Sequence, residues 1–400
     1  MTTSAPSTRA VRAGIESDTQ HGAVVPPLHL STNYSFNGLG LNGVGGKRAY
    51  DYSRSGNPTR DLLGEALADL EQGAGAVVTA SGMSAVALAL ELVPAGATVL
   101  AAHDCYGGTW RLLDAWAKKG RFSVAFADLT DPAALAAGLA KKPALVWVET
   151  PSNPLLRITD IRHVAHAAHA VGALVVVDNT FLSPALQQPL ALGADLVVHS
   201  TTKYINGHSD VVGGAVVART SGLAEQIKWW GNCNGLTGGA FDSYLTLRGL
   251  RTLGVRLRQH EENAARVAEH LARHGAVRRV YYPGLAEHPG HALAGRQQQG
   301  FGAMLSFELE GEVEEIAAFV DGLEYFSLAE SLGGVESLIA HPASMTHASM
   351  APEARRTAGI ADTLLRLSVG IEDGDDLLRD LDAALHRAAA VGASKRKVRA

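Results

Sequence analysis

Seven short apolar runs occur between residues 76 and 219, and stretches with helical periodicity lie between them. The runs consist largely of Val, Ala and Leu and do not alternate with polar residues, which is typical of strands buried on both faces. Such strands form mostly parallel sheets between two layers of helices, so the pattern predicts a doubly wound α/β domain. The predicted strands are 76–80, 97–102, 123–128, 144–150, 173–179, 194–200 and 213–219.

The rest of the chain departs from this pattern. Residues 1–59 show little periodicity and are rich in Gly, Asn, Pro and Ser, which predicts an extended N-terminal arm. We place the large domain at residues 60–255; it begins with a helix over 60–72 that Thr59 could cap. A long helical region then leads to a smaller α+β domain over 256–400. The strands predicted there are 277–283, 303–310 and 364–370.

Length and composition agree with two domains. A chain of 400 residues exceeds what a single hydrophobic core usually serves, and 46% hydrophobic with 19% charged residues is typical of a globular protein. The net charge of -5 gives no electrostatic basis for binding nucleic acid or an anionic membrane. The only basic cluster, SKRKVRA at residues 394–400, reads as a solvated tail. We therefore expect small-molecule partners, without nucleic acid or membrane.

The N-terminus and the cysteines indicate the compartment. The opening sequence MTTSAPSTRAVRAG lacks the apolar core of a signal peptide, and the most apolar stretch, 85–102, is interrupted by Glu91 and Pro94. Cys105 and Cys233 cannot form a disulfide framework, and Cys105 is expected to be a small buried residue rather than a nucleophile. We expect a cytoplasmic protein.

Two motifs resemble ligand-binding sites but lack the features that such sites need. GLGLNG at residues 38–43 fits the dinucleotide pattern GxGxxG, but no predicted strand precedes it and no helix follows. His163, His166 and His169 recur at helical spacing without acidic or cysteine partners nearby, which favours an ordinary helix face over a metal site. We assign neither a nucleotide nor a metal to these motifs.

Polar residues follow four of the apolar runs, where ligands of open α/β sheets bind. Any one of them could be a helix cap or a turn residue, but capping alone does not explain their common position at the ends of strands. They are Ser81, Gly82, Met83, Glu149, Asn153, Asp178, Ser200, Thr202 and Lys203.

Lys203 lies in HSTTKYINGHSDVVGG, directly after a predicted buried strand. A bare ammonium in a pocket is costly, but a lysine that forms a Schiff base with an aldehyde loses its charge. Asp178 could keep a pyridine nitrogen protonated, so that the ring accepts electrons. Ser200, Thr202 and the SGMSA turn could hold a phosphate, and Tyr106 could stack on the ring. These are the parts of a pyridoxal 5′-phosphate site.

Longer motifs extend this interpretation over residues 10–390. The chain contains DYSRSGNPTRD, SGMSA, ETPSNPLLR, VVVDNTFLSPALQQPLALGADLVVHSTTKYINGHSDVVGG, LTGGAFDSYLTLRGLRTL, AESLGGVESLIAHPASMTHA and LLRLSVGIED. In these motifs it resembles the Cys/Met-metabolism family of fold-type I pyridoxal phosphate enzymes. The resemblance implies a large doubly wound domain, a smaller C-terminal α+β domain and an N-terminal arm.

The resemblance also implies roles for individual residues. Lys203 would form the Schiff base and move protons with help from Tyr106, while Asp178 would pair with the pyridine nitrogen. Arg366 would grip the substrate α-carboxylate. The remaining implied contacts are the phosphate ligands Gly82, Met83, Ser200 and Thr202, the phosphate ligands Tyr52 and Arg54 supplied by a neighbouring subunit, and the pocket residues Asn153 and Ser331.

Within the family, the resemblance is strongest to bacterial enzymes that replace the succinyl group of O-succinyl-L-homoserine with L-cysteine. Arg111 could meet the distal carboxylate of the succinyl ester, although an ordinary surface arginine is an equal alternative. Asp51 and Glu330 could bind the amino group of the incoming cysteine or of cystathionine. The arm residues imply at least a dimer, and the family implies a homotetramer.

Other activities of the family stay open. Cystathionine gamma-lyases and O-acylhomoserine sulfhydrylases share the same cofactor residues, and Glu330 counts only against the beta-lyases. Methionine gamma-lyases carry a cysteine where this chain has Gly108, which counts against that activity. A non-catalytic binding module is a remote alternative, because a binding protein would not need a Schiff-base lysine.

Overall fold

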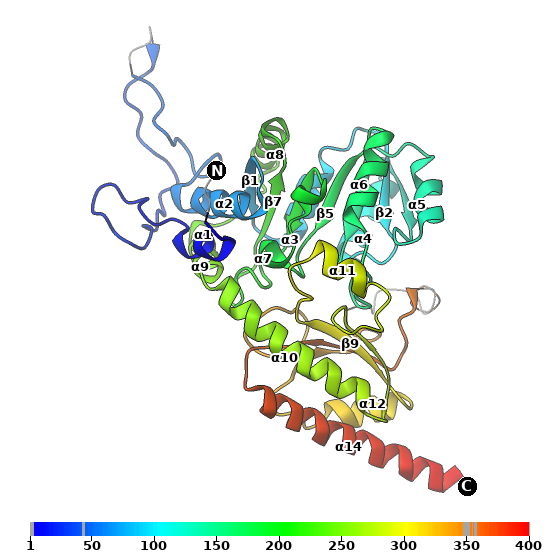
Figure 1. The fold of residues 1–400 in the computed structure, drawn as a ribbon. Coiled ribbons are helices and arrows are strands. Elements are labelled where there is room, and N and C mark those ends of the chain that lie inside the picture. Colours follow the sequence, from blue (N-terminus) through cyan, green and yellow to red (C-terminus); the bar gives the residue numbers. More distant parts are fainter. Residues whose placement is uncertain (1–3, 42–44, 347–352, 354, 356–357, 400) are drawn as a thin grey trace.

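The computed structural model describes residues 4–41, 45–346, 353, 355 and 358–399. It contains two β-sheets that are connected by long helices (Figure 1). Within the described residues, no helix is both long enough and apolar enough to cross a membrane.

The larger sheet has seven strands in the order β1-β7-β6-β5-β4-β2-β3. Strand β7 runs antiparallel to both β1 and β6, and the other neighbours are parallel. Each predicted run between residues 76 and 219 overlaps one of these strands, which confirms the mostly parallel sheet. Their bounds are β1 Gly75–Thr79, β2 Thr98–Ala102, β3 Ser123–Ala127, β4 Leu145–Glu149, β5 Leu174–Asp178, β6 Leu196–His199 and β7 Gly214–Ala218.

Helices cover this sheet, as the doubly wound pattern requires. Helix α3 contacts α4 and α8, while α5 contacts α6. The helix predicted over 60–72 is α2, but Asn57 caps it instead of Thr59: its side chain accepts from the backbone N–H groups of Thr59 and Arg60. The bounds are α2 Pro58–Glu71, α3 Gly82–Leu90, α4 Gly107–Lys118, α5 Pro132–Leu139, α6 Ile161–Ala170, α7 Ser183–Leu186, η2 Pro189–Leu192 and α8 Ser221–Asn234.

The second sheet has five strands in the order β10-β11-β12-β9-β8. Helix α10 runs from the large sheet along to this smaller one, and α14 packs on α12 beyond it (Figure 1). The bounds are β8 Val277–Tyr281, β9 Met304–Leu309, β10 Ser327–Leu328, β11 Leu338–Ala340, β12 Leu364–Ser368, α9 Ala240–Leu250, α10 Leu253–Arg273, α11 His291–Gln297, α12 Val313–Val320 and α14 Gly374–Arg399. The two- and three-residue strands β10 and β11 were not predicted.

The N-terminal arm is only partly extended. Helix α1, Pro6–Arg12, contacts α2 and α10, and Arg9 forms an ion pair of 2.8 Å with Asp69. The segment that follows forms loops that project from the body (Figure 1), and a single bridge joins Asn33 to Tyr52. The predicted division at residue 256 falls inside α10, so the domain limits stay a prediction.

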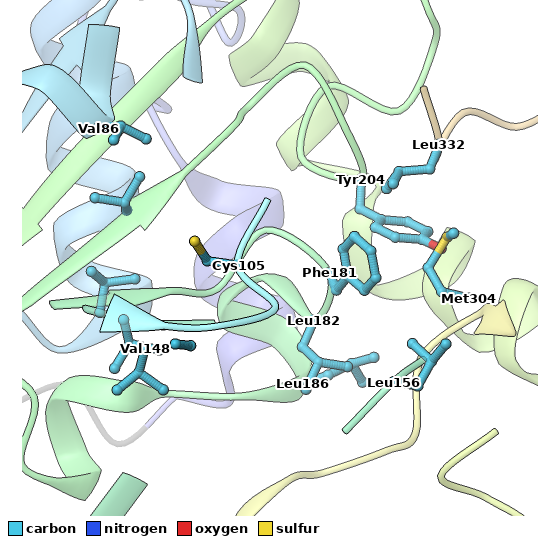
Figure 2. Close-up of a cluster of buried hydrophobic side chains, with 14 of the residues drawn as sticks. Val86, Cys105, Val148, Leu156, Phe181, Leu182, Leu186, Tyr204, Met304 and Leu332 are labelled. Carbon is cyan, nitrogen blue, oxygen red and sulfur yellow. The ribbon is translucent and has the colours of Figure 1, made fainter. Parts of the chain in front are cut away.

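The two parts of the chain share one hydrophobic core. Figure 2 shows Leu182 and Leu186, which follow β5, close to Leu156, while Tyr204 lies against Leu332 and Met304. Cys105 is buried near this cluster, and burial raises the pKa of its thiol well above the usual value. A buried, protonated thiol matches the structural role expected for Cys105.

Candidate active site

A cavity of about 650 Å³ opens at the carboxyl ends of the parallel strands. Its wall combines residues of the large sheet with residues of the smaller part of the chain. The structure therefore brings together most of the residues that the sequence singled out. Those that line the cavity are Gly82, Met83, Tyr106, Arg111, Asn153, Asp178, Ser200, Thr202, Lys203, Glu330, Ser331 and Arg366.

Lys203 lies in the turn after β6, and its Nζ donates a hydrogen bond of 2.6 Å to Oγ of Ser331. Burial lowers the pKa of Lys203 to about 8; the positive charge of Arg366 adds to this effect, and Glu330 opposes it. A lysine with this pKa is partly neutral near pH 7, which is the form that attacks an aldehyde.

Ser331 occupies an unusual backbone conformation, with φ of 79°. Left-handed backbone is uncommon outside glycine and costs free energy, so the surrounding contacts must hold it. The carbonyl of Ser331 accepts a 2.9 Å hydrogen bond from Arg366 Nη2. Ser331 thus connects the lysine to the arginine.

Arg366 on β12 is 3% exposed, and its burial lowers the pKa of the guanidinium to about 10. Its Nη1 donates to Oδ1 of Asn153 at 3.1 Å, whereas its buried Nε has no hydrogen-bond partner among the described residues. A buried cation with an unused donor fits an anionic ligand, and guanidinium groups match carboxylates well.

Asp178 ends β5 and lies opposite Glu149 of β4 in the sheet register. Burial raises the pKa of both carboxyl groups, and the negative charge of Asp178 raises that of Glu149 further. The backbone N–H of Thr180 donates to Asp178 Oδ1 at 3.0 Å, and the backbone N–H of Tyr106 donates to Glu149 Oε2 at 2.6 Å. A protonated ring nitrogen beside Asp178 would offset the cost of burying this charge.

The start of α3 forms a cradle on the cavity wall. Ser81 caps the helix by accepting from the backbone N–H of Ser84 at 3.1 Å. A Cβ at Gly82 would lie 2.7 Å from Cβ of Ser200, so only glycine permits this approach. Helix N-termini bind phosphates through free N–H groups and the helix dipole. The serine hydroxyl and this helix end fit a phosphate.

Tyr106 precedes α4, and its position depends on Gly108. A Cβ at Gly108 would lie 2.5 Å from a ring carbon of Tyr106 and 2.8 Å from Sδ of Met83. The structure thus leaves no room for a larger residue at this position while Tyr106 stays in place.

Three predicted residues do not line the cavity of their own chain. Asp51 forms an ion pair of 2.9 Å with Lys47. Arg54 Nη1 donates to the carbonyl and to Oδ1 of Asn232, at 2.8 and 2.7 Å. Tyr52 lies beside Arg54, 5.6 Å from ring centroid to guanidinium carbon. Their predicted role across a subunit interface stays a prediction.

The cavity is also lined by residues that were not predicted as site residues. Thr180 lies two residues after β5, and its Oγ1 accepts from the backbone N–H of Ser200 at 2.9 Å, so the rule about strand ends could have found it. Ser81 and Glu149, which the sequence had already grouped with Lys203 at the strand ends, also line the cavity. Nothing in the sequence placed the other residues beside Lys203, because they come from distant loops or from apolar positions. These further lining residues include Phe181, Val212, Met345 and Thr346.

The motifs that were set aside carry no part of this site. Of GLGLNG, residues 42 and 43 lie outside the described residues. His163, His166 and His169 lie on α6, and His169 Nε2 is 2.8 Å from Oδ2 of Asp195, a partner that the sequence had not revealed.

Comparison with known proteins assigns the class. Residues 7–386 match the family of Cys/Met metabolism PLP-dependent enzymes. The chain belongs to this family. It is therefore a pyridoxal phosphate-dependent enzyme with the fold-type I architecture that the motifs implied, and the residues of the cavity fit that cofactor: an amine, a buried carboxylate and a helix-end cradle.

Individual relatives refine the comparison. The chain is 57% identical to cystathionine gamma-synthase of Escherichia coli (strain K12), over 94% of this chain and 96% of that protein. It is 47% identical to a cystathionine beta-lyase of Lactococcus lactis, over 95% and 98%. A crystal structure of cystathionine gamma synthase from Xanthomonas oryzae pv. oryzae, in complex with aminoacrylate and cysteine, is similar with a TM-score of 0.95 and 66% identity, over 97% and 100% of the two chains.

Proposed function

We propose that the protein is a cystathionine gamma-synthase. In this reaction the bond between Cγ and the ester oxygen of O-succinyl-L-homoserine breaks, a bond from Cγ to the sulfur of L-cysteine forms, and succinate leaves. The similarity to two proteins of that name carries the proposal, at 57% and 66% identity over nearly the whole chain. The cavity agrees with it, since Lys203, whose pKa is lowered, lies near a buried arginine that has a hydrogen-bond donor unused by any residue the structure describes.

Pyridoxal phosphate, when bound, supplies an electron sink that makes the substrate Cα–H acidic. Around it, Lys203 would attach the cofactor and move protons, with Tyr106 assisting. Asp178 would keep the ring nitrogen protonated, and Arg366 would orient the substrate through its α-carboxylate together with Asn153 and Ser331. Gly82, Met83, Ser200 and Thr202 would hold the phosphate.

Three further residues would bind the succinyl group and the second substrate. Arg111 lies on α4 at the exposed side of the cavity, where it can meet the distal carboxylate of the succinyl group. Glu330 also lines the cavity and can accept hydrogen bonds from the amino group of the incoming cysteine or of cystathionine. Asp51 belongs to the arm and would take part from a neighbouring subunit.

The active sites are shared in a homotetramer. Tyr52 and Arg54 lie outside their own cavity, and the arm exposes large apolar side chains that a second copy would cover. The exposed apolar residues of the arm include Val24, Val25, Leu30, Phe36, Leu39 and Leu41. We place the enzyme in the cytoplasm, in keeping with the two cysteines, which are both free thiols.

Product analysis tests the proposed reaction. The protein, loaded with pyridoxal phosphate, is incubated with O-succinyl-L-homoserine and L-cysteine, and the products are identified by mass spectrometry. Cystathionine and succinate are expected in equal amounts, and Lys203→Ala serves as the inactive control. Release of succinate without cystathionine in the presence of cysteine would refute the synthase assignment.

A further inference from the structure

Arg256 on α10 is a buried cation that binds only neutral groups. It is 5% exposed, and burial lowers the pKa of its guanidinium to about 10. Within the described part of the chain it forms no ion pair with a carboxylate. Buried charges usually have a charged partner, so the retention of this one calls for a structural reason.

The hydrogen bonds of Arg256 converge on the residues that follow Lys203. Its Nη1 donates to the carbonyl of Tyr204 at 2.8 Å, and its Nη2 donates to the carbonyl of Ile205 at 3.3 Å. The same Nη2 donates to the carbonyl of Gly249 at 2.9 Å. One guanidinium thus ties the backbone of the lysine-bearing turn to the end of α9.

The fit between the turn and the two helices leaves no space for other side chains. Gly207 has φ of 72°, and a Cβ there would lie 2.0 Å from Arg256 Nη1. A Cβ at Gly249 would lie 2.1 Å from the carbonyl oxygen of Asn206. The backbone of the turn therefore packs directly against α9, and the side chain of Arg256 packs against the turn at Gly207.

The guanidinium is itself held in place. Its Nε donates to Oγ1 of Thr252, the residue directly before α10, at 3.1 Å. The ring of Tyr204 meets His260 of α10 edge-on, with centroids 5.4 Å apart, and Leu332 lies beside Tyr204 in Figure 2. The backbone and the side chain of Tyr204 are thus both fixed, and Lys203 is the adjacent residue.

We propose that Arg256 is a positioning residue for Lys203: by holding the carbonyls of Tyr204 and Ile205, it fixes the backbone from which the lysine reaches Ser331 and the cofactor. This inference rests on the proposed role of Lys203 as the reacting amine. Without the guanidinium, buried carbonyls lose their partners and the turn has to shift to find others. Lys203 would then leave its half-buried position between Arg366 and Glu330.

The test uses the protein without cofactor, so that it does not depend on activity. The pH dependence of the acetylation of Lys203 is measured by mass spectrometry in wild-type protein, in Arg256→Met and in Arg256→Lys, which keeps a charge if the Met variant does not fold. The control is Asn263→Ala: Asn263 is 1% exposed on the same helix and donates to the carbonyls of Gly370 and Glu372, neither of which belongs to the turn.

In the Arg256 variants we expect the midpoint of Lys203 acetylation to rise by about one pH unit or more, toward the value of an ordinary lysine, because the amine becomes better solvated. The dissociation constant of pyridoxal phosphate should rise about tenfold or more, because a rise of one unit in the pKa of Lys203 lowers the fraction of neutral amine about tenfold below that pKa. Asn263→Ala should lower the melting temperature but leave both values unchanged. Unchanged values in the Arg256 variants would overturn the proposal, while the proposed reaction is judged separately by the wild-type products.

Discussion

Lys203 and Ser331 are 128 residues apart in the sequence, yet Nζ of the lysine donates a 2.6 Å hydrogen bond to Oγ of the serine. The lysine comes from the turn after β6 of the large sheet, whereas the serine precedes β11 of the small one. The cavity is therefore complete only when both parts of the chain are packed together. Any change that separates them should impair cofactor binding before it unfolds either sheet.

The depressed pKa of Lys203 predicts how the protein without cofactor takes up pyridoxal phosphate. The neutral amine reacts with the aldehyde, so the rate should rise as the pH passes about 8 and then level off. Stopped-flow absorbance at several pH values measures this rate. A rate that still rises steeply above pH 10 would show that Lys203 titrates as an ordinary lysine.

Arg111 is predicted to select the succinyl ester. Replacing it with Met should raise KM for O-succinyl-L-homoserine about 10- to 100-fold, the range for losing a hydrogen bond to a charged group. O-acetyl-L-homoserine, which lacks the distal carboxylate, should be affected little. Lys118→Met is the matched control, since Lys118 is another cation of α4 and pairs with Asp114 at 2.7 Å. Equal losses on both esters would contradict the assignment.

Gly108 and Gly107 form a matched pair for the position of Tyr106. A Cβ at Gly108 would collide with the Tyr106 ring, whereas a Cβ at Gly107 would meet only the carbonyl of Thr346, at 3.8 Å. Gly108→Ala should lower kcat/KM by about tenfold or more, in line with the cost of overpacking. Gly107→Ala should retain nearly full activity. If the two variants behave alike, the position of Tyr106 does not depend on Gly108.

Sharing of active sites predicts complementation between two inactive variants. Lys203→Ala and Arg54→Ala are unfolded together, refolded and assayed. If Arg54 acts on the neighbouring subunit, mixed assemblies contain intact sites, and activity should recover to about a quarter of the wild-type value in a randomly paired assembly. If Arg54 acts within its own chain, no intact site can form and the mixture stays inactive.

The sequence predicted those site residues whose location follows from their position directly after a strand. Parallel strands end at the same edge of a sheet, so Asp178 and Lys203 could be placed together from their positions after apolar runs. The left-handed backbone of Ser331 and the carbonyl partners of Arg256 could not be predicted, because they depend on contacts between segments far apart in the sequence. The cap of α2 was mispredicted for a local reason, because Asn57 and Thr59 are both good capping residues and lie only two positions apart.

The central claim is that this cavity favours synthesis of cystathionine over its cleavage. Its most direct test compares kcat/KM of one preparation for O-succinyl-L-homoserine, at saturating L-cysteine, with kcat/KM for cystathionine alone, by following succinate and 2-oxo acid release. The account predicts efficient use of the succinyl ester and slow cleavage of cystathionine. An inert succinyl ester together with rapid cleavage of cystathionine would contradict it and identify the enzyme as a lyase.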